Sequence, residues 1–171
     1  MTQFQIGEKV VYPNHGIGTI ENISSRAFGN RFERFYLLRL TYNSSMTVMV
    51  PFSHVTDVGL RRITRNGEVG RVLDFLAEGT CLCKGDWKDR FKDNSDKMRN
   101  GSLLEIAEVL KTLLILQMDK PLSFRDKRML DRARHMLITE LSISRGLPEA
   151  SASSLIERAL AKASLPLPPP L

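Results

Sequence analysis

The sequence predicts an α+β protein of two domains, in which a small N-terminal β-barrel precedes an all-α bundle of five helices. Short apolar segments separated by turn residues fill residues 1–58, which is the pattern of strands. From Gly59 onward, apolar residues recur at helical spacing. A chain of 171 residues is long enough for two small cores. We therefore expect a β-domain over 1–58, a helical domain over 59–165 and a disordered proline-rich tail over 166–171.

Four strands are expected in the β-domain, separated by turn residues. Gly29-Asn30 is a turn sequence at which positive φ is tolerated, and Pro51 ends the last strand because proline cannot donate a ladder hydrogen bond. The expected strands are 7–12, 17–23, 31–40 and 46–50. Short strands at this spacing favour a small barrel, since the segment is too short for a sandwich.

Helix-start signals divide the second domain into helices. Ser102 and Glu105 form a capping box, and Ser123 repeats the signal with Asp126 in place of glutamate. Pro148 suits the first position of the last helix. The five expected helices lie at about 68–76, 86–98, 102–114, 123–141 and 148–163. The third is expected to be the most buried, because its apolar positions are the most closely spaced.

Composition and charge bound the class of protein. The hydrophobic fraction is 42 % and the charged fraction 26 %, which is typical of a globular protein. No apolar run reaches the roughly 18 residues of a membrane span, and the N-terminus lacks the basic segment followed by an apolar segment of a signal peptide. A cytoplasmic protein is therefore expected. The net charge is +6, and nearly all of this excess falls after residue 59. Such an excess is compatible with a polyanionic partner and with simple solubility.

Motifs for catalysis and metal binding are missing from the sequence. Cys81 and Cys83 stand one residue apart, which supplies only half a zinc site and would strain a disulfide. His15, His54 and His135 have neither metal-ligand spacing nor a nucleophile beside them. A phosphate-binding glycine loop and a nucleophile elbow are also missing. We therefore expect no cofactor, no metal and no enzymatic activity.

The only tryptophan, Trp87, stands among cations at an expected helix start. Asp86 is a plausible N-cap, and Trp87, Phe91 and Met98 share one helix face at spacings of four and seven. This spacing is typical of a core residue. The neighbouring cations instead favour an aromatic that phosphate contacts hold at DNA and that inserts at a base step. Composition leaves both interpretations open.

A second basic cluster lies at the start of the fourth expected helix. It consists of Arg125, Lys127, Arg128, Arg132 and Arg134. A pair between Lys127 and Asp131 would make part of it an ordinary solvated surface. Its position in the first turns of a helix would also let its cations and free backbone N–H groups act on one phosphate. The two readings remain open on the sequence alone.

Several motifs, taken together and in order, resemble the CarD family (also called CdnL), whose β-module is shared with transcription-repair coupling factors. The likeness covers the chain to about Ala163. The motifs are Gly-Glu-Lys-Val-Val-Tyr-Pro-Asn-His-Gly at 7–16, Val-Met-Val-Pro at 48–51, Val-Gly-Leu-Arg at 58–61, Trp-Lys-Asp-Arg-Phe-Lys at 87–92, Gly-Ser-Leu-Leu-Glu-Ile-Ala-Glu-Val-Leu at 101–110 and Leu-Ser-Phe-Arg-Asp-Lys-Arg-Met-Leu at 122–130 with Ala133-Arg134.

The resemblance implies a Tudor-like barrel that binds the RNA polymerase β subunit, and a helical domain that grips the minor groove of promoter DNA near the upstream edge of the −10 element. It assigns to Trp87 the role of a wedge that stabilises the open complex. Phosphate contacts are implied for Arg90, Lys92, Lys127 and Arg128, and polymerase contacts for Arg26, Leu37, Met49 and Pro51. The protein would associate with the nucleoid through polymerase. A monomer is expected, and an exposed strand edge leaves a dimer open.

Two departures and two alternatives accompany this interpretation. Some family members carry arginine where this chain has Met49, which would make an ionic contact apolar, and Asp89 occupies a position that is basic in some relatives.

One alternative is a pure protein adaptor, in which the helices bind a second protein. The other is an RNA- or ribosome-associated barrel, against which the net charge of only +1 over residues 1–59 argues, with five basic and four acidic side chains.

Overall fold

The computed structural model describes residues 3–13, 15–41, 45–80 and 87–170, with the backbone alone for Phe28, Trp87 and Lys88. The chain forms two compact units, Met1–Ile63 and Thr64–Leu171. We call them the sheet unit and the helical unit and describe each by itself. No helix in the described part of the chain is long and apolar enough to cross a membrane.

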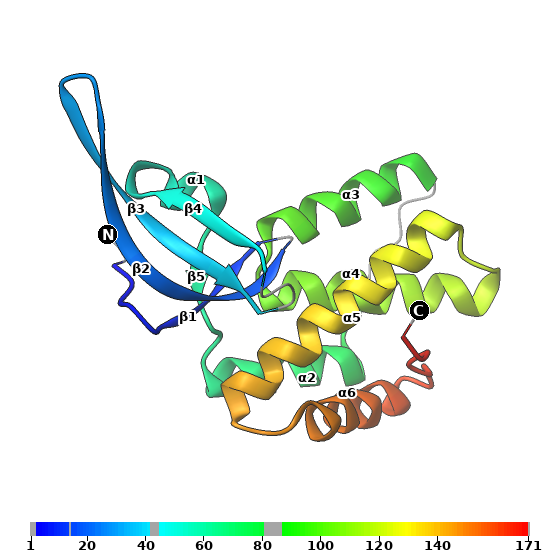
Figure 1. Ribbon diagram of the computed structural model, residues 1–171. Helices are drawn as coiled ribbons and strands as arrows, with labels where there is room; N and C mark the ends of the chain where they lie inside the picture. Colours follow the sequence, from blue (N-terminus) through cyan, green and yellow to red (C-terminus); the bar gives the residue numbers. More distant parts are fainter. Residues whose placement is uncertain (1–2, 14, 42–44, 81–86, 171) are drawn as a thin grey trace. The chain divides into compact units, whose positions relative to one another are not determined.

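The sheet unit is a five-stranded antiparallel sheet (Figure 1). Its strands are β1 (Lys9–Tyr12), β2 (Gly16–Phe28), β3 (Arg31–Leu40), β4 (Thr47–Pro51) and β5 (Arg61–Arg62), in the spatial order β4-β3-β2-β1-β5. The edge strands β4 and β5 are not paired with each other in the described residues, so the expected closed barrel is wrong and the sheet is open. Closure fails because the chain leaves β4 as a 3-10 turn (Phe52–His54) and a single helical turn, α1 (Val55–Val58), before β5.

Four of the five strands follow the expected segments, and the differences have local causes. β2 extends to Phe28, beyond the expected end, because it stays paired with β3 as far as the turn. Gly29 in that turn has φ +61°, as the turn chemistry predicted. β5 was missed because two consecutive arginines carry no alternating pattern; Val10 and Val11 of β1 pair with them.

The core of the sheet unit lies on one face of the sheet. Tyr36 and Leu38 of β3 are 2 % and 0 % exposed, and Ile20 of β2 packs beside them. The Tyr36 hydroxyl accepts a hydrogen bond from the Phe4 backbone N–H at 3.0 Å, and its ring stacks on Phe52 at 4.3 Å. These contacts hold the N-terminal segment and the turn after β4 against the sheet.

The helical unit contains α2 (Asn66–Glu78), α3 (Trp87–Asn100), α4 (Leu103–Asp119), α5 (Phe124–Arg145) and α6 (Glu149–Lys162). With α1, the described residues hold six α-helices, so the expectation of five is wrong for the chain; the additional helix is the single turn in the sheet unit. Two of the starts are capped as predicted. The Ser102 hydroxyl accepts from Glu105 N–H, and the Ser123 hydroxyl accepts from Asp126 N–H, both at 3.2 Å.

Helix α4 runs through the centre of the helical core, and Lys111, its only cationic residue, lies within that core. Lys111 is 3 % exposed, and its ammonium donates to the carbonyl oxygens of Phe75 and Gly79 at 2.8 and 2.7 Å. These carbonyls belong to the C-terminal end of α2, where a helix leaves acceptors unsatisfied and favours a cation. The sequence pattern did not predict this cap.

The beginning of the proline-rich tail is attached to the helical unit. Leu165 is 7 % exposed, and Leu167 packs against the same core. Leu165 N–H also donates to the carbonyl of Leu160 at 3.0 Å. The expectation of a tail that hangs free from residue 166 therefore fails at Leu167, because two leucines among the prolines find apolar surface to cover.

Candidate functional site

The register of the sheet brings the four predicted polymerase-facing residues onto one face. Leu37 of β3 lies opposite Met49 of β4, and Phe35 lies opposite Pro51. Arg26 of β2 lies opposite Glu33 of β3. Opposite residues share a face, and so do alternate residues of a strand. The four residues therefore lie on the face opposite to the Tyr36 core, with Leu37, Met49 and Pro51 at the β4 edge and Arg26 on β2, beyond the end of β4.

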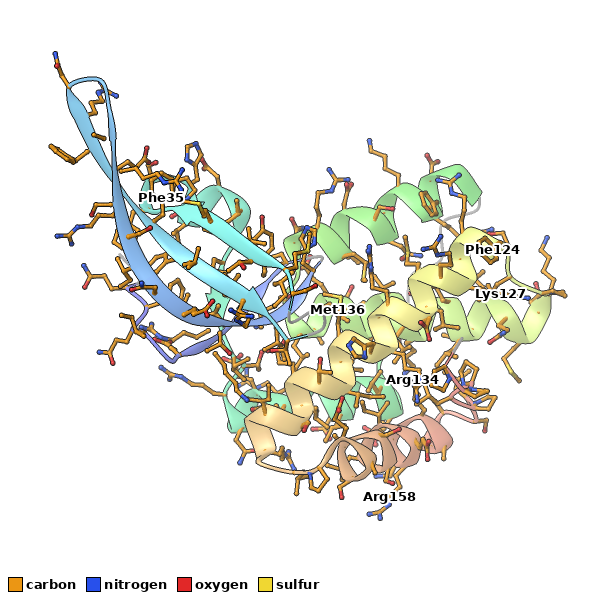
Figure 2. All side chains as sticks on the ribbon, viewed as in Figure 1. Phe35, Phe124, Lys127, Arg134, Met136 and Arg158 are labelled. Atoms are coloured by element: carbon orange, nitrogen blue, oxygen red, sulfur yellow. The ribbon has the colours of Figure 1, made fainter. Side chains whose placement is uncertain are left out.

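The exposure of the four residues on this face differs between the apolar side chains and the charged one. Leu37, Met49 and Pro51 are half-buried, whereas Arg26 is exposed. Phe35, which sequence reasoning did not single out, is 7 % exposed although it lies on the same face (Figure 2). Its strand position, one alternation from Leu37, was the signal that could have identified it. The result is a small apolar area with an arginine at its side.

The two basic segments of the helical unit, far apart in sequence, are joined through one contact. The Arg125 guanidinium of α5 lies 3.8 Å from the centroid of the Phe91 ring of α3, a cation–π distance. Arg90 and Lys92 flank Phe91 in α3, and Lys127 and Arg128 follow Arg125 in α5. The contact therefore places the four predicted phosphate-binding residues on neighbouring parts of two helices.

Three of these four cations are available to a partner. Lys92, Lys127 and Arg128 are exposed, whereas Arg90 is half-buried and has an interaction partner within the chain. Within the described residues Lys127 forms no ion pair, so the pair with Asp131 that the sequence allowed is not made. Figure 2 shows Lys127 beside the start of α5. An exposed ammonium without a carboxylate partner is suited to a phosphate.

Phe124, the first residue of α5, is an exposed aromatic that sequence reasoning missed. It is 71 % exposed, and the Arg128 guanidinium lies 5.8 Å from its ring centroid (Figure 2). Its position directly after the Ser123 cap, before the buried stripe of α5 begins at Leu130, was the available signal. The surface at the start of α5 is therefore both apolar and basic.

Carboxylates neutralise the C-terminal half of α3. The Lys97 ammonium lies 2.8 Å from a Glu108 carboxylate oxygen and 3.5 Å from one of Asp93, and Arg99 lies 3.1 Å from Asp96. Partial burial lowers the pKa of Lys97, but hydrogen bonds and charge from Glu108 and Asp93 outweigh burial and raise it overall. Two of the acidic residues of α3 are therefore engaged by Lys97 and Arg99.

The side chain of Trp87 lies outside the described residues, as do Lys84 and Asp86 and the thiols of Cys81 and Cys83. The backbone of Trp87 begins α3, as predicted. On the helix face that it shares, Met98 is 3 % exposed and Phe91 is half-buried. Burial along this face thus decreases toward the start of α3. The direction of the indole remains a prediction.

The described residues offer no constellation for catalysis. No group of three metal-ligating side chains occurs among them. A cavity of about 300 Å³ in the sheet unit is lined by apolar residues such as Phe52 and Leu60 and by the polar side chains of Gln3, Tyr36 and Thr56. Among the residues described, this lining holds no histidine, carboxylate or cysteine, so the Thr56 hydroxyl has no base beside it that would activate it as a nucleophile.

Comparisons with known proteins agree with the division of the chain. Residues 4–64 match the family model of the CarD-like/TRCF RID domain, and residues 71–157 match that of the CarD C-terminal domain. The chain is 35 % identical over 151 residues to "Putative transcription factor YdeB" of Bacillus subtilis (strain 168), covering 88 % of this chain and 98 % of that protein. These matches are to transcription factors and not to enzymes.

Proposed function

The chain belongs to the CarD family of transcription factors, and from this premise we propose that its sheet unit binds the RNA polymerase β subunit while its helical unit stabilises the promoter open complex. The premise agrees with the prediction that the chain is not an enzyme.

The proposed polymerase contact is the face that carries Arg26, Leu37, Met49 and Pro51. The pair Leu37–Met49 and the neighbouring Pro51 supply an apolar centre that a partner can desolvate, and Arg26 supplies a charge beside it. Apolar centres with arginine nearby are typical of energetically important interface residues. With methionine at position 49, the centre relies on apolar burial and should depend weakly on salt.

The proposed DNA contact is the surface formed by Arg90 and Lys92 of α3 and Lys127 and Arg128 of α5. The observation that supports it is the Arg125–Phe91 contact, which brings the two basic segments next to each other. Lysine and arginine neutralise phosphates and release counterions, so affinity falls as salt rises. Four cations predict weak binding to free DNA, which tethering to polymerase would raise through local concentration.

Trp87 is proposed to act as a wedge in the minor groove, where the duplex opens near the upstream edge of the −10 element. Unstacking a base step costs a few kcal/mol. Stacking of a base on an aromatic side chain returns roughly 1–3 kcal/mol. The wedge would therefore shift an opening equilibrium that is nearly balanced, without catalysing a reaction. The proposal for Trp87 rests on its position at the first residue of α3, next to the basic residues of that helix.

The test is the lifetime of open complexes on purified promoters with wild-type protein and Trp87→Ala. We expect a shorter lifetime with Trp87→Ala at unchanged affinity for the β subunit. The variant Arg158→Ala, which truncates an exposed cation on α6, is the control and should behave as wild type. An unchanged lifetime with a folded Trp87→Ala protein would refute the wedge.

Neutralising three cations distinguishes DNA binding by the helical unit from the alternative in which the chain is a pure protein adaptor. The triple variant Arg90→Gln/Lys92→Gln/Lys127→Gln should shorten the open-complex lifetime and flatten its salt dependence if these residues contact phosphates. If transcription on purified promoters stays unaffected, the helical unit contacts a second protein instead of DNA.

A further inference from the structure

The hairpin formed by β2 and β3 extends past the rest of the sheet (Figure 1). Pairing between β3 and β4 ends at Phe35–Pro51, whereas pairing between β2 and β3 continues to Phe28–Arg31. Residues 25–34, which we call the hairpin tip, are therefore a two-stranded ribbon, and no third strand pairs with it among the residues that the structure describes. The proposed function makes no use of this ribbon beyond Arg26.

The hairpin tip exposes a large aromatic side chain. Phe32 is 84 % exposed, more than any other exposed large hydrophobic residue in the described part of the chain. The residue opposite it is Ala27, whose methyl group is too small to cover the ring. Phe32 is also absent from the core of the sheet unit. It therefore contributes little to folding, and its apolar area is free to be buried by a partner.

Exposed cations lie on both faces of the ribbon around this ring. Arg34 is two residues from Phe32 and shares its face, whereas Arg31 is adjacent in sequence and lies on the opposite face. Neither arginine forms an ion pair within the described residues. Glu33, the acidic residue of the hairpin tip, is hydrogen-bonded to the hydroxyl of Ser53. The tip is thus an aromatic projection with positive charge on either side.

We propose that the hairpin tip is a second DNA-binding element, which inserts into a groove of duplex DNA. A groove has phosphates along both rims, so a ribbon that enters it meets negative charge on both faces. A two-stranded ribbon fits the major groove, which is about 12 Å wide. Arg31 and Arg34 bind phosphates on opposite rims, and Phe32, which lies on the same face as Arg34, contacts sugars and base edges on that side of the groove. A flat acidic protein surface would engage the cations of one face only.

The inference goes beyond the proposed function, because it does not require the helical unit to bind DNA. It assigns to the sheet unit a sequence-independent contact with duplex DNA, because Arg31 and Arg34 bind phosphates, which carry no sequence information. Arg26, already proposed as a polymerase contact, is left out of the experiment so that the two contacts are tested separately.

The test measures binding of the full chain to a duplex of mixed sequence by fluorescence anisotropy at several salt concentrations. The charge-neutralising variant is Arg31→Gln/Arg34→Gln. Removing two phosphate contacts should make the slope of log affinity against log salt shallower by about 1.8, from roughly 0.9 per contact. Between 50 and 200 mM salt, wild-type affinity should then fall about 12-fold more than that of the variant. Phe32→Ala should weaken binding at least about 5-fold, the effect of losing roughly 40 Å² of buried apolar surface at about 25 cal/mol per Å², with little change in slope because no charge is removed.

The control variant Lys9→Gln/Lys162→Gln removes the same charge from exposed positions outside both proposed surfaces and should keep the wild-type slope. The variant Lys92→Gln/Lys127→Gln reports the helical surface separately. If it loses slope while the hairpin variant does not, the hairpin inference fails and the proposed function stands. If only the hairpin variant loses slope, the helical DNA contact fails. If the hairpin variants lose affinity for the β subunit but not for DNA, the tip docks on protein and the inference is overturned.

Discussion

The contact between Arg125 and Phe91 can be tested directly, because it joins α3 to α5 across the proposed DNA surface. The perturbation is a double-mutant cycle of Phe91→Leu and Arg125→Gln. Leucine keeps an apolar side chain but has no ring quadrupole, and glutamine keeps part of the stem but has no charge. The guanidinium lies 3.8 Å from the ring centroid, well inside the roughly 6 Å limit for such contacts.

The magnitude of the coupling follows from the exposure of the two partners. Cation–π contacts contribute about 0.5–1 kcal/mol at exposed sites and about 2 kcal/mol when desolvated. Arg125 is exposed and Phe91 is half-buried, so the coupling free energy should be about 1 kcal/mol. Each single variant also loses packing, but the cycle cancels these separate losses.

The assay is urea unfolding followed by the far-ultraviolet helical signal, which reports the helical unit because the long helices α2–α6 all belong to it. A second cycle of Phe91→Leu with Arg158→Gln is the control, since Arg158 is an exposed cation on α6. Distant pairs should be additive within about 0.5 kcal/mol. A coupling in the Arg125 cycle no larger than that of the control would refute the contact, and with it the joining of the two basic segments.

Two further predictions concern buried and half-buried lysines of the helical unit. Lys111→Met should lower the free energy of unfolding by about 3 kcal/mol. Two hydrogen bonds from a charged donor, at about 1.5–3 kcal/mol each, are lost, and removal of the buried charge offsets part of this loss. Urea titration measures the change, and a gain in stability would contradict the capping role of Lys111. Lys97 has a raised pKa, so its contribution to stability is complete below the ordinary lysine pKa of 10.5 and is lost as the pH rises through the folded-state pKa. Stability measured from neutral to alkaline pH should therefore decline less in Lys97→Met than in wild type, and equal declines would contradict the pairing with Glu108 and Asp93.

Local signals in the sequence determined where most elements begin and end. Ser102 and Ser123 cap their helices as predicted, and Gly29 adopts the positive φ that its turn requires. These features depend on groups within a few residues of each other, so a local pattern contains the information. The same holds for the alternation in β3, which put Leu37 and Tyr36 on opposite faces. Family membership, too, was accessible from ordered motifs.

Only the tertiary structure decided features that depend on contacts between distant segments. The sheet stays open because the chain leaves β4 in a 3-10 turn and a helical turn before β5, and the pairing of β5 with β1 is not indicated by any pattern in Arg61-Arg62. Lys111 finds carbonyl acceptors more than thirty residues away, and Arg125 finds Phe91 on another helix. A charged residue in a helix has the same local pattern whether it meets water, a carbonyl or a ring. Its partner is selected by how the helices pack, and packing is a property of the whole core.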